Sequence, residues 1–127
     1  MNVLLVCPTY PPNDVPCGVG DFTAELAPRL ARRGASVVVA ASTRHRGPTD
    51  GDVRVLRVAT SWNRRAVRDV VAVARRQRFD VVNVQYSPEL YGRGPWLKAL
   101  PAWLALARGP RVVLTAHTVV GGYPSAR

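Results

Sequence analysis

Glycines 18 and 20 flank Val19 at the point where a Pro-rich loop passes into the first predicted helix. The first backbone N–H groups of a helix have no partner within it and carry the positive end of its dipole, so they can bind an anion. Glycine lets a ligand approach that backbone closely. The triplet Gly18-Val19-Gly20 therefore predicts a phosphate-binding site, and a plain turn is the alternative that so short a pattern leaves open.

A histidine and a polar loop are expected at the same edge of the fold. His117 directly follows the last predicted strand, and residues 85–95 follow the strand before it. The carboxyl ends of parallel strands meet at one edge, where α/β folds bind ligands, so three separate segments would converge on one cleft. Imidazole can donate or accept a proton near neutral pH, which makes His117 the candidate catalytic residue. His45, in an arginine-rich loop, is expected at the surface.

Strand-like and helix-like segments alternate along the chain, which predicts an α/β fold with a Rossmann-like, doubly wound parallel sheet. Strands are expected at residues 3–7, 36–41, 53–58, 81–84 and 111–115, and helices at 20–33, 63–78 and within 96–108. Right-handed crossovers then give the strand order 3-2-1-4-5. The domain is expected to be cut short after strand five, because such sheets normally cover that strand.

The apolar residues of the predicted helices indicate which face of each helix packs against the core. Phe22, Leu26 and Leu30 recur every four residues of the first helix and are expected to face the core. Pro28 is expected to kink or split that helix, because proline lacks the N–H that the helix needs. Pro101 is expected in the first turn of the regular part of the third helix. The second helix has an apolar stripe of Val67, Val70, Val71 and Ala74.

Composition limits the class of protein. The chain has 127 residues, 47% of them hydrophobic, which suits one domain with its own core. The longest uncharged apolar stretch, residues 99–107, is too short to span a membrane, and the amino terminus does not resemble a signal peptide, so a cytoplasmic location is expected. The net charge of +10 comes almost wholly from arginine and would attract phosphate-bearing partners, although no specific nucleic-acid module is visible. Cys7 and Cys17 lack the spacing of a metal site or disulfide scaffold.

Four segments resemble the amino-terminal domain of GT-B glycosyltransferases, specifically the large retaining group numbered family 4. They are VLLVCPTYPP, CGVGDFTAELAPRLARRGASVVVAAS, FDVVNVQYSPELYG and RVVLTAHT. The resemblance implies transfer of a glycosyl group from a nucleotide-sugar donor to an acceptor with retention, without a metal or other cofactor. It also implies a carboxyl-terminal donor domain that has no counterpart in these residues, so this fragment alone is expected to be inactive.

The resemblance also implies roles for individual residues. Gly18 matches a glycine that approaches the donor phosphates, whereas Cys17 stands where relatives have the other glycine of the pair. His117 matches a histidine that contacts the donor sugar. Acceptors in this family are frequently lipid-linked, so contact with the inner face of the membrane is an open alternative. The candidate acceptor-binding residues are Tyr10, Gln85, Tyr86, Glu89 and Tyr91.

Two other functions stay open beside glycosyl transfer. A non-catalytic basic module that binds phosphate-bearing ligands, or docks to a partner, would suit the positive charge and the bare last strand. A nicotinamide-dependent oxidoreductase fits less well, because the segment after Gly20 lacks the third glycine of the fingerprint. No acidic residue follows the second strand either, where such enzymes bind the ribose.

Overall fold

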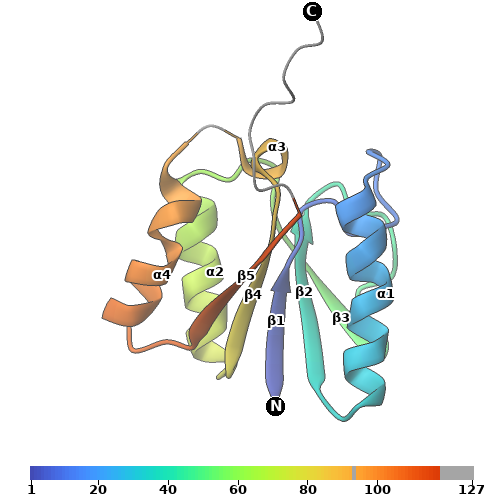
Figure 1. Ribbon diagram of the computed structural model, residues 1–127, viewed down its shortest axis with the longest axis horizontal. Helices are drawn as coiled ribbons and strands as arrows, with labels where there is room; N and C mark the ends of the chain where they lie inside the picture. Colours follow the sequence, from blue (N-terminus) through green and yellow to red (C-terminus); the bar gives the residue numbers. More distant parts are fainter. Residues whose placement is uncertain (93, 118–127) are drawn as a thin grey trace, which may run out of the picture.

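The computed structural model describes residues 1–92 and 94–117 as a five-stranded sheet between two layers of helices (Figure 1). The strands are β1 (Asn2–Val6), β2 (Ser36–Ser42), β3 (Val53–Ala59), β4 (Val81–Tyr86) and β5 (Arg111–Ala116). The helices are α1 (Gly18–Arg32), α2 (Arg64–Arg76), α3 (Pro88–Tyr91) and α4 (Trp96–Leu106). Every pairing is parallel and the order is β3-β2-β1-β4-β5, so the predicted topology is confirmed.

The central strand β1 is buried on both faces, because helices cover the sheet from both sides (Figure 1). Leu4 and Val6 pack in one core cluster with residues of α2 and α4. Leu5 and Cys7 point the other way and pack in a second cluster with residues of α1. This burial fixes β1 in the middle of the sheet, and the loop that follows it therefore emerges at the middle of the carboxyl edge.

Helix α1 buries a face that only partly matches the predicted one, since Leu30 packs against the core as expected and Phe22 does not. Thr23 and Ala27 are fully buried against the sheet, whereas Phe22 is 47% exposed. The prediction for Phe22 was wrong because small residues let this helix lie close to the strands, which turns this larger side chain outward. Helix α1 also runs through Pro28 without splitting, since packing holds a helix that has lost one hydrogen bond.

The opposite layer follows the predicted pattern more closely. The apolar stripe of α2 lies in the core, and Asn63 caps the helix by accepting from the Ala66 N–H over 3.0 Å. Helix α4 begins at Trp96, so Pro101 lies inside it and not in its first turn. The short helix α3 was not predicted. Strands β2 to β5 each extend one or two residues beyond the predicted carboxyl end, whereas β1 starts and stops one residue earlier.

Strand β5 forms one edge of the described sheet. Val113 and Leu114 point to opposite faces and are 46% and 56% exposed. Both faces of this edge strand therefore carry exposed apolar side chains, and the expectation of a truncated domain stays a prediction.

Candidate functional site

Three segments that are far apart in the sequence meet at the carboxyl edge of the sheet. The backbone N–H of His117, which follows β5, donates to the carbonyl oxygen of Tyr86 at the end of β4 over 2.9 Å. The His117 ring bonds the Gln85 side chain, with 2.8 Å between Nε2 and Oε1. The ring of Phe22 in α1 lies edge-on to the imidazole, with 5.0 Å between centroids. His117 is therefore held against both β4 and the beginning of α1.

A chain of side-chain hydrogen bonds orients the His117 ring. Gln85 is fully buried, and its Nε2 donates to Oδ1 of Asn83 over 2.8 Å. The Thr115 hydroxyl donates to the same oxygen over 3.1 Å. With both amides oriented in this way, Gln85 presents its oxygen to His117, so a neutral imidazole has its proton on Nε2. The Nδ1 atom of His117 is then left as an acceptor for a ligand hydroxyl.

The two glycines at the start of α1 have different surroundings. A Cβ on Gly20 would clash with the carbonyl oxygen of Thr9, so glycine is needed there for the helix to pack against the preceding loop. A Cβ on Gly18 would meet nothing within 4 Å, and Gly18 is exposed. Packing therefore explains Gly20, whereas the open backbone at Gly18 leaves space for a ligand beside the first N–H groups of the helix.

Cys17, the residue before α1, is half-buried beside this helix start. Burial raises the pKa of its thiol, but bonds from the Thr9 hydroxyl and the backbone N–H groups of Gly20 and Val19 outweigh burial and lower the pKa overall. The same backbone groups favour negative charge in any ligand that binds here. Burial raises the pKa of Cys7, which lies in the core, and both cysteines are free thiols.

Tyr10 and His45 pack together beneath the Pro-rich loop. His45 is only 3% exposed, so the expectation of a surface histidine was wrong. Its Nδ1 lies 3.1 Å from the carbonyl oxygen of Tyr10, and the two rings are 5.8 Å apart. The loop after β2 folds over the loop after β1, a long-range contact that local sequence does not encode. Tyr10 is 8% exposed and belongs to the core cluster around Leu5.

Backbone and ionic contacts also hold the Pro-rich loop. The Arg46 N–H donates to the Pro12 carbonyl oxygen over 2.9 Å, and the Arg46 guanidinium pairs with Asp14 at 2.6 Å. These contacts join the segment before α1 to the loop after β2. The Pro-rich loop therefore positions the start of α1 with support from β1 on one side and from the loop after β2 on the other.

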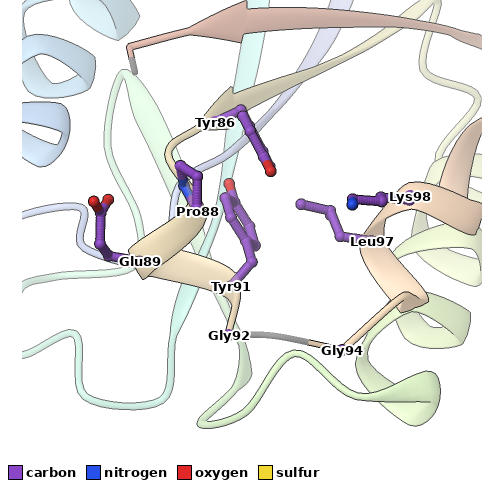
Figure 2. A pocket seen from close by; sticks show the side chains of 8 residues that line it. All are labelled: Tyr86, Pro88, Glu89, Tyr91, Gly92, Gly94, Leu97 and Lys98. Atoms are coloured by element: carbon purple, nitrogen blue, oxygen red, sulfur yellow. The ribbon is translucent and has the colours of Figure 1, made fainter. Parts of the chain in front are cut away.

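A cavity of about 540 Å³ opens beside the carboxyl end of β4 (Figure 2). Three of the predicted acceptor-binding residues line it, and they are Tyr86, Glu89 and Tyr91. Figure 2 shows the Tyr86 hydroxyl directed into the space between α3 and α4, with the Lys98 amine facing it from the other side. Gln85 is not among the lining residues, because its side chain reaches His117 instead.

The two remaining lining candidates are held in place by hydrogen bonds. Tyr91 is 5% exposed, and its hydroxyl contacts the carbonyl oxygens of Gln85 at 2.7 Å and Val6 at 3.1 Å. Burial raises the pKa of this phenol well above its ordinary value. Glu89 is exposed, and a hydrogen bond from the Ser87 hydroxyl lowers its carboxyl pKa. Tyr91 therefore forms a fixed wall of the cavity, whereas Glu89 lies on the outer side of α3 (Figure 2).

Lys98 and Leu97 complete the cavity, and sequence reasoning missed both. Lys98 is the only lysine of the chain, which was a usable signal. Within residues 1–92 and 94–117, no three histidine, cysteine or acidic side chains gather closely enough to hold a metal ion. The described helices also include none that is long and apolar enough to cross a membrane.

The comparison with protein families shows which family has this sequence. A model described as Glycosyltransferase Family 4 matches residues 16–127. The chain belongs to Glycosyltransferase Family 4. The match covers α1 and the whole sheet except β1, so it includes the helix start, the Gln85–His117 pair and the cavity. The search of curated proteins and the search of solved structures found no match for this glycosyltransferase-family chain.

Proposed function

We propose that this chain is the amino-terminal, acceptor-side domain of an enzyme that transfers a glycosyl group from a nucleotide-sugar donor with retention. Membership of Glycosyltransferase Family 4 gives the reaction class. The observation that carries the proposal is the convergence of His117, the start of α1 and a cavity at one sheet edge. A carboxyl-terminal domain would supply the remaining contacts to the nucleotide.

The donor phosphates would bind at the start of α1. The Gly18 backbone is open to solvent, and the neighbouring N–H groups already favour negative charge at the Cys17 sulfur. The nearby His117 would contact the donor sugar through Nδ1, since Gln85 occupies Nε2. A fixed polar group of this kind acts on charge that develops as the glycosidic bond breaks.

The acceptor would occupy the cavity of Figure 2. Its volume of about 540 Å³ falls within the range of small-molecule sites. Tyr86 and Tyr91 provide aromatic surface that suits a sugar ring or an apolar group. Lys98 provides one positive charge beside them, which favours an acceptor that carries an anionic group.

The test is release of nucleoside diphosphate from a panel of sugar nucleotides by the full-length protein, with the product anomer assigned by proton NMR. His117→Ala should lower kcat by about 10²-fold, because a preorganised polar group is lost from the reacting centre. Arg33→Gln, an exposed change at the end of α1, is the control and should keep full activity. A His117→Ala variant as active as the control, or an inverted product, would overturn the proposal.

A further inference from the structure

A second cleft lies at the amino edge of the sheet, opposite the edge that holds His117. It has a volume of about 510 Å³, and its lining includes four arginines from three places in the fold: the end of α2, the turn after α4 and the start of β5. Arg75 lies in the last turn of α2, and Arg78 lies just beyond it. Arg108 follows α4, and Arg111 begins β5. The cleft thus gathers guanidinium groups that are up to 36 positions apart in the sequence.

The backbone at two of these arginines is unusual. Helices α1, α2 and α4 end in the same hydrogen-bonded turn, which places one residue in the left-handed conformation. In α1 that residue is Gly34, with φ 96°. In α2 and α4 it is Arg78 and Arg108, with φ 51° and 52°. The chain therefore uses glycine, which adopts this conformation freely, at one helix end and arginine at the two ends that face the cleft.

Helix stabilisation does not explain this choice at Arg78. A positive charge near the end of a helix interacts favourably with its dipole, but a side chain in the last turn achieves this without a left-handed backbone. Helix α1 shows that solution, with Arg29 and Arg32 in its last turn and Gly34 after it. Helix α2 likewise already has Arg75 and Arg76 in its last turn. Helix α4 has no basic residue in its last turn, so Arg108 serves its dipole. Arginine at position 78 thus needs a different reason, and strained residues of this kind gather at binding sites.

Among the described residues, Asp80 is the one acidic side chain that lines the cleft with the four arginines, and no ion pair is found between them. The ion pairs found in residues 1–92 and 94–117 join Glu25 to Arg29 and Asp14 to Arg46, which lie elsewhere. The Asp80 Oδ2 accepts from the backbone N–H of Asn2 over 2.6 Å, and its single negative charge offsets one of the four positive charges. The lining of this open cleft therefore has a surplus of positive charge.

We propose that this cleft binds a small polyphosphate anion, either a free inorganic polyphosphate or the phosphate chain of a nucleotide. Guanidinium groups bind phosphate oxygens through paired hydrogen bonds, and groups from three places in the fold can surround several linked phosphates. All four arginines line one cleft of about 510 Å³, so a small anion fits better than an extended nucleic-acid strand. The site is independent of the proposed donor site, because it lies at the other end of the strands.

The test is calorimetric titration of the full chain with inorganic triphosphate at fixed ionic strength. The wild-type protein should bind, and the Arg78→Gly plus Arg108→Gly variant should bind at least tenfold more weakly. This variant should melt no earlier than the wild type, because glycine suits both backbone positions. The matched control is Arg32→Gln plus Arg33→Gln, which removes the same charge at the end of α1 and should change the affinity less than twofold.

Two further titrations tell a nucleotide from a free polyphosphate and tell this cleft from the proposed donor site. Adenosine triphosphate that binds as tightly as inorganic triphosphate supports a site for the phosphate chain alone, and tighter binding supports a nucleotide site. His117→Ala should leave the affinity for inorganic triphosphate unchanged. The proposal is overturned by a wild-type protein that does not bind, by equal weakening in the control, or by loss of binding in His117→Ala.

Discussion

At the scale of single residues, the two glycines of one short motif differ in purpose. Gly20 lies against the Thr9 carbonyl oxygen, whereas Gly18 lies open. The sequence pattern predicted the position of both at the helix start but could not separate them, because the difference comes from a loop that packs on only one of them.

Alanine substitutions at these glycines should therefore have opposite results. Gly20→Ala should lower the free energy of unfolding by about 3 kcal/mol, because the added methyl group forces backbone apart. Gly18→Ala should leave it unchanged or raise it by up to about 1 kcal/mol, since alanine favours a helix more than glycine does. Urea denaturation of both variants measures this, and equal losses would contradict the assignment.

The contact between Gln85 and His117 gives a second prediction. Gln85→Leu should remove the acceptor for the Nε2 proton, so the imidazole should become a mixture of its two neutral tautomers. The free energy of unfolding should fall by only about 1 kcal/mol, because His117 is half-buried and can bond water instead. Nitrogen chemical shifts of the His117 ring at high pH measure the tautomers. An unchanged ratio would mean that Gln85 does not orient the ring.

At the scale of elements, the order of strands was predictable and the packing of loops was not. Alternating strand and helix patterns, together with right-handed connections, lead to one topology. The buried position of His45 and the short helix α3 depend on contacts between distant segments, which local patterns do not contain. The exposed position of Phe22 was missed for another reason. The spacing of apolar residues does not show that a face of smaller residues lets the helix pack closer to the sheet.

Tyr91 joins α3 to the ends of β1 and β4, and this predicts a pH effect. Its pKa is raised by burial, so the unfolded chain loses the phenol proton first as the pH rises above about 10. Its contribution to stability is therefore complete below that pH and decreases above it. Tyr91→Phe should cost about 1–2 kcal/mol at pH 8, from the lost hydroxyl bonds, and should show a shallower decline in alkali. Urea denaturation at pH 8 and pH 11 tests this, and parallel declines would contradict it.

The ends of the helices give a further prediction. Arg78→Gly and Arg108→Gly should each raise the free energy of unfolding by about 0.5–1 kcal/mol, because glycine relieves the left-handed backbone at the expense of a dipole interaction. Gly34→Ala, the reverse change at the matching position of α1, should lower it by about 1 kcal/mol. Thermal denaturation compares the three variants, and arginine variants that melt earlier would contradict the assignment of strain.

At the scale of the whole molecule, the parallel sheet separates two regions of different chemistry. Its carboxyl edge holds a histidine, an open helix start and an aromatic cavity, and its amino edge holds the arginine cleft. The net charge of +10 was read from the sequence as a general property. The fold places four of the arginines at the amino edge of the sheet. The sequence could not predict this grouping, because it depends on which helix ends lie together.

The central claim is that the carboxyl edge binds a sugar nucleotide. The most direct measurement follows backbone amide signals by NMR in the Arg78→Gly plus Arg108→Gly variant, so that binding at the arginine cleft does not contribute. The probes are UDP-glucose, UDP-N-acetylglucosamine, GDP-mannose and ADP-glucose. At least one should shift the amides of Gly18 and Val19 together with those of Tyr86 and His117. Signals at this edge that stay unchanged with all four probes would contradict the claim.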